Sequence, residues 1–406
     1  MNRLGDLIDK LCPEGIEYKK LSDVTTVDRG KRVVRGQLSQ EGGYPVYQNS
    51  LTIMGYHTES NYPANTSFII GAGAAGEIGF SCVDFWAADD CFPVVGNSQI
   101  LDRYIYHVLL WKKPVLTSRV RKASIPRLSR TVIEDLVIPV PPLEVQREIV
   151  RILDNFTELT AELTAELTAR KKQYEFYRDK LLSFDVHGGA HNVVWRTLGE
   201  VAKFIYGYTD KAKESGSARF IRITDISEDG TLNPYDAKYV ELTEESKKYL
   251  LKKGDLLLAR TGATYGKTLY FDSDEPSVYA SFLIKLILDN DLIRNRYYWH
   301  FSKSSLYWTQ AEKYVSKGGQ QQFNANAVGR IKIPIPSLEI QDRLIGVLDN
   351  FDAICTDLNI GLPAEIEARQ KQYEYYRDAL LTFAATGSTI SDRQTDRQTD
   401  RQTEPN

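Results

Sequence analysis

Two segments of the chain have the hydrophobic pattern of long helices that pack against other helices. Between Leu143 and Phe184 there is neither proline nor glycine. From Ile149 onward, apolar and aromatic residues recur at alternating steps of three and four, with polar interruptions at Thr160 and Arg170. This is the spacing of a heptad seam, and a helix of about forty residues with such a seam is about 60 Å long.

A second segment, from Leu338 to Phe383, repeats both ends of this seam. Gly361, Leu362 and Pro363 lie in its middle, and they predict a break or a kink in the helix there. Because two helices with apolar stripes in one chain most simply bury those stripes together, we expect the two segments to pack on each other.

The helical segments belong to a sequence repeat that begins before them. The motif Ile-Pro-x-Pro-x-Leu-Glu-x-Gln occurs at 138–146 and at 333–341, an offset of 195 residues. The motif Arg-x-Lys-Gln-Tyr-x-x-Tyr-Arg-Asp-x-Leu-Leu-x-Phe occurs at 170–184 and at 369–383, an offset of 199 residues. The second copy therefore contains four additional residues between its two motifs.

The segments outside the repeat, at about 15–137 and 188–332, predict globular domains. They are rich in Tyr, Val, Ile and Thr with scattered Gly, as expected for short strands and turns. A glycine-containing turn follows a strand-like run in each of them, at Gly71–Gly76 and Thr261–Gly266. This shared turn indicates two domains of similar architecture and different surface. The strand-like runs are Thr66–Ile70, Val94–Val95, Asp255–Leu258 and Ser281–Ile287, and Asp291–Trp308 has a helical pattern.

These patterns predict an α+β protein with a pseudo-two-fold internal repeat, in which two globular domains of mixed helix and strand alternate with two long helical spacers. Three copies of Asp-Arg-Gln-Thr end at Thr403, and this tail has too few apolar residues to fold. The predicted boundaries are 1–137 for the first domain, 138–187 for the first spacer, 188–332 for the second domain, 333–385 for the second spacer and 386–406 for a disordered repeat tail.

Composition narrows the class of protein. No apolar run is long enough to span a bilayer, and the N-terminus lacks the apolar stretch of a signal peptide. The four cysteines have no metal-ligand spacing, which indicates reduced thiols, and we expect a cytoplasmic protein without a metal site. The formal net charge of −3 argues against a uniformly basic nucleic-acid binder but is compatible with local basic patches.

Three short motifs suggest chemistry that a simpler interpretation explains better. Gly262–Thr268 is one residue short of a phosphate-binding P-loop, so a tight turn is favoured, with Lys267 available to a nucleic-acid phosphate. His187 and His191 lie in a glycine-rich stretch without further metal ligands, which favours a flexible connection. Asn233-Pro234-Tyr235 resembles an incomplete amino-methyltransferase motif, and a turn is favoured there. We therefore predict no catalytic residue.

Basic clusters in both domains are better candidates for function. The segment from Lys112 to Arg130 contains no acidic residue, and Lys303, Lys313 and Lys317 lead into a Gly-Gly-Gln-Gln-Gln sequence. Arg and Lys neutralise phosphates, while Arg and Gln make bidentate contacts to base edges, although any one cluster is equally compatible with a solvated surface. The candidate DNA-binding residues are Arg29, Lys31, Arg32, Arg35, Arg119, Arg121, Lys122, Arg127, Arg260, Lys267, Lys313, Lys317, Gln320 and Gln321.

The first helical segment also contains a four-residue repeat. Thr160–Leu163 and Thr164–Leu167 both read Thr-Ala-Glu-Leu. Good helix formers repeated in this way have a simple structural interpretation. The functional alternative is a variable spacer, since adding or removing four residues moves the ends of the helix by about 6 Å, or one to two base-pair steps of DNA.

Together, the two repeated motifs and the Thr-Ala-Glu-Leu units resemble the specificity subunit of type I restriction–modification systems, in the subgroup with variable Thr-Ala-Glu-Leu spacers. The resemblance covers the chain up to about Phe383 and leaves out the Asp-Arg-Gln-Thr tail. It implies two target-recognition domains, each binding one half of a split DNA site, and two antiparallel coiled-coil helices, 143–184 and 338–383, that set the gap between the halves.

The same resemblance implies a subunit without catalytic activity or a cofactor of its own. Its partners would be double-stranded DNA, two methyltransferase subunits that bring S-adenosylmethionine, and two motor-nuclease subunits that use ATP and Mg. The family motifs identify the spacers and not the residues that contact bases. Two alternatives stay open from the sequence: a coiled-coil scaffold that binds only proteins, and a nucleotide-binding enzyme that uses the Gly262–Thr268 loop.

Overall fold

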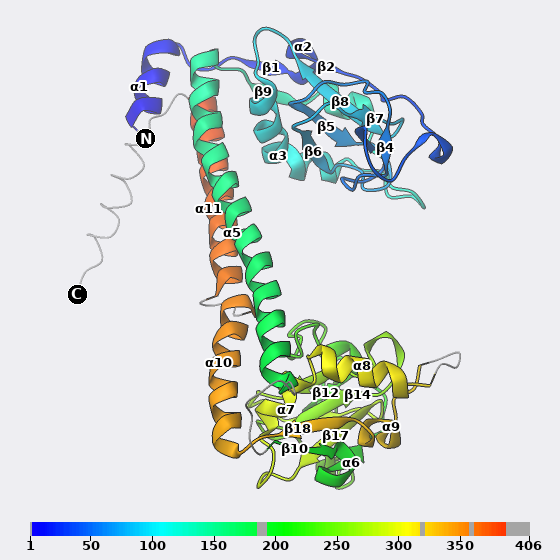
Figure 1. Ribbon diagram of the computed structural model, residues 1–406. Helices are drawn as coiled ribbons and strands as arrows, with labels where there is room; N and C mark the ends of the chain where they lie inside the picture. Colours follow the sequence, from blue (N-terminus) through cyan, green and yellow to red (C-terminus); the bar gives the residue numbers. More distant parts are fainter. Residues whose placement is uncertain (1, 185–192, 317–320, 357–360, 387–406) are drawn as a thin grey trace, which may run out of the picture. The chain divides into compact units, whose positions relative to one another are not determined.

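The computed structural model describes residues 2–184, 193–316, 321–356 and 361–386. The chain divides into two compact units: the first consists of residues 1–162 with 367–406, and the second of residues 163–366. Each unit contains one domain of mixed helix and strand together with parts of the long helices, as Figure 1 shows. The predicted tail lies outside the described residues apart from Thr386.

The long helices form as the sequence predicts. Helix α5 (Leu143–Ser183) is a single helix of 41 residues. The second copy of the repeat forms two helices, α10 (Leu338–Thr356) and α11 (Leu362–Thr386), which confirms the predicted break. Pro363 lies in the first turn of α11, where its missing N–H removes no hydrogen bond of the helix.

The domain of the first unit contains two sheets. The larger sheet is antiparallel and has the strand order β2-β8-β5-β6, and helix α3 (Asp102–Ser118) packs on it. In the smaller sheet, β3 pairs antiparallel with β4 and parallel with β7. The bounds are β2 (Thr25–Val27), β3 (Tyr44–Tyr47), β4 (Tyr56–His57), β5 (Thr66–Ile70), β6 (Ile78–Ser81), β7 (Trp86–Ala87) and β8 (Cys91–Gly96).

The domain of the second unit repeats this topology. Its larger sheet has the order β11-β17-β14-β15, and in its smaller sheet β12 pairs antiparallel with β13 and parallel with β16. The expected similarity of the two domains is therefore confirmed. The bounds are β11 (Ala202–Tyr206), β12 (Ala218–Ile221), β13 (Tyr239–Val240), β14 (Leu256–Ala259), β15 (Thr268–Tyr270), β16 (Ser277–Tyr279) and β17 (Leu283–Leu288).

The structure confirms the predicted strands and the predicted helical stretch of the second domain. The run Thr66–Ile70 is strand β5, and the other three runs overlap β8, β14 and β17. The stretch with a helical pattern at 291–308 contains α7 (Asn295–Phe301) and the start of α8 (Ser305–Tyr314). The two helices are separate because Ser304 caps the N-terminus of α8. Its hydroxyl accepts a hydrogen bond of 3.2 Å from Tyr307 N–H.

The repeated Ile-Pro-x-Pro-x-Leu-Glu-x-Gln motif joins each domain to the helix that follows it. Its first residues form strands β9 (Val137–Pro139) and β18 (Lys332–Ile335), which pair with β1 (Tyr18–Lys20) and β10 (Val194–Thr197). Its final glutamine is fully buried in both copies. Gln146 accepts a hydrogen bond from Leu101 N–H at 2.9 Å and donates to the carbonyl oxygens of Gln99 and Pro141.

Gln341 makes the same contacts in the second unit, accepting from Arg294 N–H at 2.9 Å and donating to the carbonyl oxygens of Leu292 and Pro336. A glutamine can satisfy both a donor and two acceptors of the backbone at once. The glutamine therefore fixes the first turn of the long helix against the start of the domain's helix, α3 or α7.

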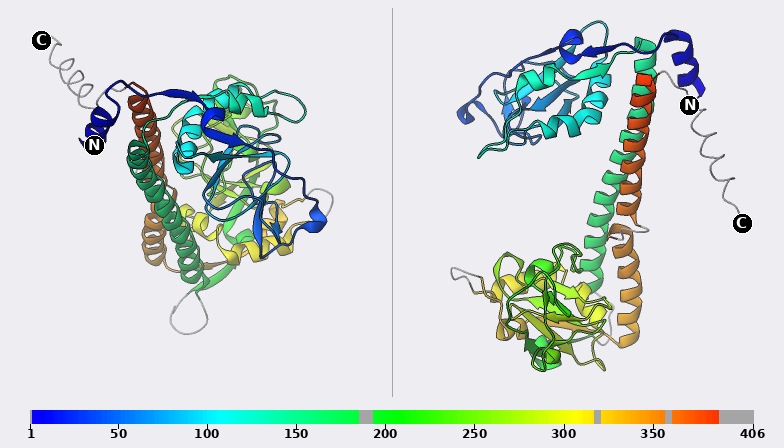
Figure 2. Two further views of the ribbon diagram at one scale, coloured as in Figure 1. Left: turned by 90° about the horizontal axis from the view of Figure 1, so that it is seen from above. Right: turned by 180° about the vertical axis from the view of Figure 1, so that it is seen from behind.

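The long helices pack antiparallel within each unit. In the first unit, Val145 near the start of α5 shares a core with Leu381 near the end of α11, and Phe156 stacks on Tyr376 with 5.1 Å between ring centroids. Both views of Figure 2 show these parts of α5 and α11 side by side. In the second unit, Tyr177 of α5 stacks on Phe351 of α10 at 5.9 Å.

The predicted seam of α5 is buried mainly at its ends. Ile149, Leu153 and Tyr174 are buried, whereas Leu163 and Leu167 in the Thr-Ala-Glu-Leu units are only half-buried and Arg170 is exposed. The Thr-Ala-Glu-Leu units therefore contribute less to the core than the ends of the helix do, although Leu167 packs against the core of the second unit.

A buried histidine connects the first domain to both long helices. His107 of α3 donates from Nε2 to Asp154 Oδ1 of α5 at 2.8 Å, and its Nδ1 lies 3.0 Å from the hydroxyl of Tyr373 of α11. Arg103 donates to the same carboxylate oxygen at 2.8 Å. Because a carboxylate only accepts hydrogen bonds, Nε2 of the neutral imidazole carries the proton, and Nδ1 accepts a hydrogen bond from the Tyr373 hydroxyl. Asp154 and Tyr373 belong to different copies of the sequence repeat.

The second unit contains the same cluster with the copies exchanged. His300 of α7 bonds to Asp349 Oδ1 of α10 at 2.7 Å, and its Nδ1 lies 3.1 Å from the hydroxyl of Tyr174 of α5. Arg296 donates to Asp349 Oδ1 at 2.7 Å. Each domain is thus held by an aspartate from its own copy of the repeat and a tyrosine from the other copy.

The histidine clusters predict that stability falls on mild acidification. Burial lowers the pKa of both His107 and His300, so the unfolded chain binds more protons than the folded chain below about pH 6.5. The pKa values of Asp154 and Asp349 are also lowered, which places their titration below that window. Thermal unfolding at pH 7.5 and 5.5 should show a larger drop in midpoint for the natural chain than for a His107→Gln/His300→Gln variant, since glutamine does not titrate. Equal drops would contradict this assignment.

Candidate nucleic-acid interface

The basic loop after α3 is held against the glycine turn that follows β5. Arg121 and Arg127 exchange backbone hydrogen bonds, at 2.8 Å from Arg121 N to Arg127 O and 3.2 Å in return. Leu128 N–H donates to Gly71 O at 2.8 Å, and Gly73 N–H donates to Pro126 O. These bonds fix both ends of a loop whose side chains, from 121 to 127, are all exposed.

The second domain has an equivalent loop at the equivalent turn. Ser316 N–H donates to Gln322 O at 3.1 Å, and Phe323 N–H donates to Arg260 O at 2.8 Å, which matches the bond from Leu128 to Gly71. Gly262 N–H donates to Gln321 O at 3.3 Å. Gln321 is exposed, while the candidates Lys317 and Gln320 lie outside the described residues. Two loops at the same position of the repeated fold therefore differ in sequence: the loop of the first domain is basic, and the described end of the other contains Gln321 and Gln322.

The cluster around Arg29 lies on a neighbouring loop in the first domain. Arg29 Nε donates to Asp89 O at 2.8 Å, and the next carbonyl, that of Asp90, accepts from Gly71 N–H at 2.7 Å. The turn Asp89–Asp90 thus connects the Arg29 loop to the glycine turn. The glycine turn is itself bonded to the Arg121–Arg127 loop. The other candidates on the loop are exposed as well: Lys31, Arg32 and Arg35.

Arg260 takes the corresponding place in the second domain. Its Nε donates to Ser281 O at 3.0 Å, and its backbone N–H donates to Phe282 O at 3.1 Å. Ser281 and Phe282 thus accept the two hydrogen bonds that Asp89 and Asp90 accept in the first domain. Its guanidinium lies over the rings of Tyr206, at 5.2 Å, and Phe282, at 5.6 Å. Both rings are exposed, by 42% and 50% respectively.

Tyr206 and Phe282 were not predicted from the sequence as parts of a site. Exposed aromatic rings beside an arginine can contact thymine methyl groups and sugars while the arginine contacts a phosphate or a guanine. Both residues continue strand-like patterns in the sequence, so only their exposure, which follows from the fold, distinguishes them from core residues.

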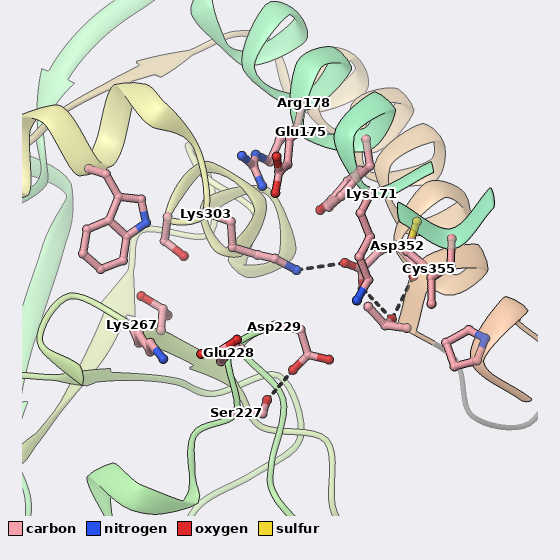
Figure 3. A pocket seen from close by; sticks show the side chains of 18 residues that line it. Lys171, Glu175, Arg178, Ser227, Glu228, Asp229, Lys267, Lys303, Asp352 and Cys355 are labelled. Atoms are coloured by element: carbon pink, nitrogen blue, oxygen red, sulfur yellow. Dashed lines mark hydrogen bonds and ion pairs between the residues drawn. The ribbon is translucent and has the colours of Figure 1, made fainter. Parts of the chain in front are cut away.

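Two other predicted candidates lie elsewhere in the second unit. Lys267 lines a pocket with a volume of about 720 Å³ between the domain and helices α5 and α10, as Figure 3 shows. Lys313 is exposed on α8, with its ammonium 5.7 Å from the Tyr314 ring. No described contact connects either lysine to the loop that contains Gln321. Arg119 and Lys122, by contrast, belong to the basic loop of the first domain.

One lysine of the predicted basic stretch is not available to DNA. Lys303 lies in the wall of the same pocket, where it pairs with Asp352 Oδ1 at 2.8 Å and covers the Trp299 ring at 3.6 Å. Burial lowers its pKa. The interpretation of Lys303 as part of a basic surface was therefore wrong, because its charge is neutralised within the protein.

The motifs with alternative chemistry form ordinary turns in the described chain. Gly262–Thr264 is one turn of 3₁₀ helix and leads into strand β15, whereas a P-loop leads into a helix. Gly262 and Gly266 have φ values of 69° and 79°, which explains the glycines. His187 and His191 lie outside the described residues. Among the residues that the structure does describe, no group of His, Cys, Asp or Glu could hold a metal ion, and no helix has the length and apolar character for crossing a membrane.

Comparison with known proteins identifies the repeated architecture. The family model described as "Type I restriction modification DNA specificity domain" matches residues 13–170 and again residues 191–368. A protein of Haemophilus influenzae named as a type I restriction enzyme specificity subunit is 32% identical over 390 residues, which cover 91% of this chain and 96% of that protein. The EcoR124I/EcoR124II specificity subunit of Escherichia coli is 38% identical over 258 residues, covering 60% of this chain and 61% of that subunit.

Solved structures show the same fold. The S subunit of a type I restriction–modification system from M. genitalium aligns with a TM-score of 0.56 and 16% identity, covering 92% of this chain and 97% of that one. A chain from a study of complex assembly and conformational transition of the type I system aligns with a TM-score of 0.55 and 17% identity, over 93% and 99% of the two chains.

The loop geometry predicts separate effects on the two halves of a DNA target. Replacing Arg121 and Lys122 by Ala removes two exposed charges from the first domain only. We expect weaker binding or relaxed preference at one half-site, by about tenfold for a lost base contact, and no change at the other. Competition binding of the complex to duplexes with one altered half-site measures this. An equal loss of preference at both halves would contradict it.

Proposed function

Since this chain belongs to the family of type I restriction–modification DNA specificity subunits and is a DNA sequence-recognition subunit, we propose that each of its domains binds one half of a split duplex site through the loops at its glycine turn. In the first domain these are the loops of Arg29–Arg35 and Arg119–Arg127. In the second they are Arg260 with its neighbouring rings and the loop that ends at Gln322.

The observation that supports this proposal is the equivalence of the two loops. The backbone bonds of Arg121 with Arg127 and of Ser316 with Gln322 place two dissimilar sequences at the same point of one repeated fold. A repeated frame with exchanged surface residues is what recognition of two different half-sites requires. Arg favours guanine and phosphate, and Gln favours adenine, so the two loops would select different bases.

The gap between the half-sites would be set by the helices. Helix α5 continues from the first unit into the second, and the boundary between the units falls at Glu162 and Leu163, inside the Thr-Ala-Glu-Leu repeat. The side chains there are half-buried or exposed, so units of four residues can be added or removed with little loss of core contact.

The chemistry of the complex would reside in partner subunits. Residues of the described chain offer no P-loop and no metal-binding cluster. We propose two methyltransferase subunits that bring S-adenosylmethionine, and two motor-nuclease subunits that bring ATP and Mg. The two equivalent units, each with an exposed aromatic residue at the same motif position, Phe176 and Tyr375, support two copies of one partner.

The spacer predicts a change of gap without a change of half-site. Deleting Thr164–Leu167 should shorten the distance between domains by about 6 Å, and the methylated half-sites should move closer while each keeps its sequence. Methylome sequencing of cells with the variant and its methyltransferase measures both properties. The matched control, Thr164→Ala, keeps the length and should keep the gap. Changed half-sites with an unchanged gap would contradict the spacer.

A further inference from the structure

A third loop lies at the glycine turn of the first domain. Residues 48–54 form this loop, which connects strand β3 to strand β4. Two consecutive amides of the glycine turn bond to two different loops. Gly73 N–H donates to Pro126 O of the basic loop at 3.1 Å, and Ala74 N–H donates to Asn49 O at 2.9 Å. The 48–54 loop is therefore a neighbour of the basic loop, at the surface through which the domain is proposed to bind DNA.

The conformation of the 48–54 loop is fixed at both ends. Met54 N–H donates to Val46 O at 2.9 Å, and Val46 N–H donates to Gly55 O at 3.0 Å, so the loop closes on strand β3. Its other contact needs a glycine in the facing turn, because a Cβ atom on Gly73 would lie only 2.8 Å from Asn49 O. The loop thus has a defined shape before any ligand binds.

This fixed loop holds two aliphatic side chains out to water. Leu51 and Ile53 are each 42% exposed, and Thr52 between them is exposed as well. Exposed turns usually carry polar residues or glycine. Contact of these two side chains with an apolar surface is favourable, because it removes them from water. It also costs little conformational entropy, because the loop is already ordered.

The corresponding loop of the second domain has its aliphatic residues covered. Strand β12 corresponds to β3, and the chain that follows it, residues 222–238, is longer. Ile226 is buried there, and Ile223 and Leu232 pack against the same core cluster. The charge of Arg222 is neutralised by Asp225 at 2.7 Å. Exposed branched aliphatic residues on this loop are therefore a property of the first domain.

The surroundings of Leu51 and Ile53 determine which ligand fits them. The neighbouring loops carry exposed cations, among them Arg32, Arg121 and Lys122. A DNA duplex matches both features. Its phosphates attract the cations, and the C5 methyl group of thymine is the apolar group that an A·T pair presents in the major groove.

We propose that Leu51 and Ile53 contact thymine methyl groups in the half-site bound by the first domain, and that they select A·T pairs at the positions that they touch. This inference rests on the proposed function, which supplies the DNA. It assigns different chemistry to the two half-sites, since the second domain has Arg260 and two aromatic rings at its glycine turn. A first half-site composed only of G·C pairs would overturn it.

The test uses the complex of the full chain with its methyltransferase subunit, and duplexes in which deoxyuridine replaces thymidine. This replacement removes the methyl group and keeps the base pair. The first half-site is the one whose preference changes in the Arg121→Ala/Lys122→Ala variant. Competition binding should show that the natural chain loses about fourfold in affinity for each contacted methyl group removed from this half-site.

The Leu51→Ser/Ile53→Ser variant should bind the thymine duplex more weakly than the natural chain by at least the same factor, and it should no longer distinguish uracil from thymine in the first half-site. Its response to uracil in the second half-site should equal that of the natural chain. The matched control, Val83→Ser/Ile287→Ser, removes two other exposed aliphatic side chains, 55% and 41% exposed, and should behave as the natural chain does.

The outcomes separate this proposal from the one on which it rests. If the affinity of the natural chain depends on the sequence of neither half-site, the proposed function fails. If sequence matters but uracil binds as tightly as thymine, or if the Leu51→Ser/Ile53→Ser variant keeps the preference for thymine with unchanged thermal unfolding, the methyl contact is overturned. Loss of methyltransferase binding in this variant would assign the loop to a protein contact, and would also overturn the proposal.

Discussion

The histidine cluster that connects each domain to two long helices is the constraint on which the rest of the structure depends. His107 contacts Asp154 and Tyr373, and His300 contacts Asp349 and Tyr174. Removing one partner leaves a buried polar group unsatisfied, at a cost of about 1–3 kcal/mol. Because the aspartate and the tyrosine come from different copies of the repeat, neither domain can be fixed by its own copy alone. A domain that must bind DNA at a set position needs such an attachment to the spacer.

The same arrangement explains why the repeated motifs have their sequences. The final Gln of the first motif binds three backbone groups, and the first Tyr of the second motif completes the histidine cluster. These residues hold the frame together through hydrogen bonds within the chain. The residues that differ between the two domains do not have this structural role. The loops at Arg121–Arg127 and Ser316–Gln322 are an example, since they occupy the same position and differ in sequence.

Much of the frame could be predicted from the sequence because its signals are local. Heptad spacing predicted α5, Gly361 and Pro363 predicted the break before α11, and the run Thr66–Ile70 predicted β5. The site was harder, since it depends on contacts between distant residues. Lys303 is one lysine among several in the sequence, and only the fold shows that Asp352 neutralises it. Tyr206 and Phe282 resemble core residues until the sheet leaves them exposed beside Arg260.

The central claim is that each domain selects its own half-site on a shared frame, and a domain duplication tests it most directly. Residues 21–136 and 198–331 have matched ends, because Leu21 N–H donates to Leu136 O and Leu198 N–H donates to Ile331 O, both at 2.8 Å. A chain in which 198–331 replaces 21–136 keeps the strand pairs, the helices and a histidine cluster in each unit. Methylome sequencing should then show a target with the second half-site at both ends and the original gap. Methylation that retains the first half-site would contradict the account.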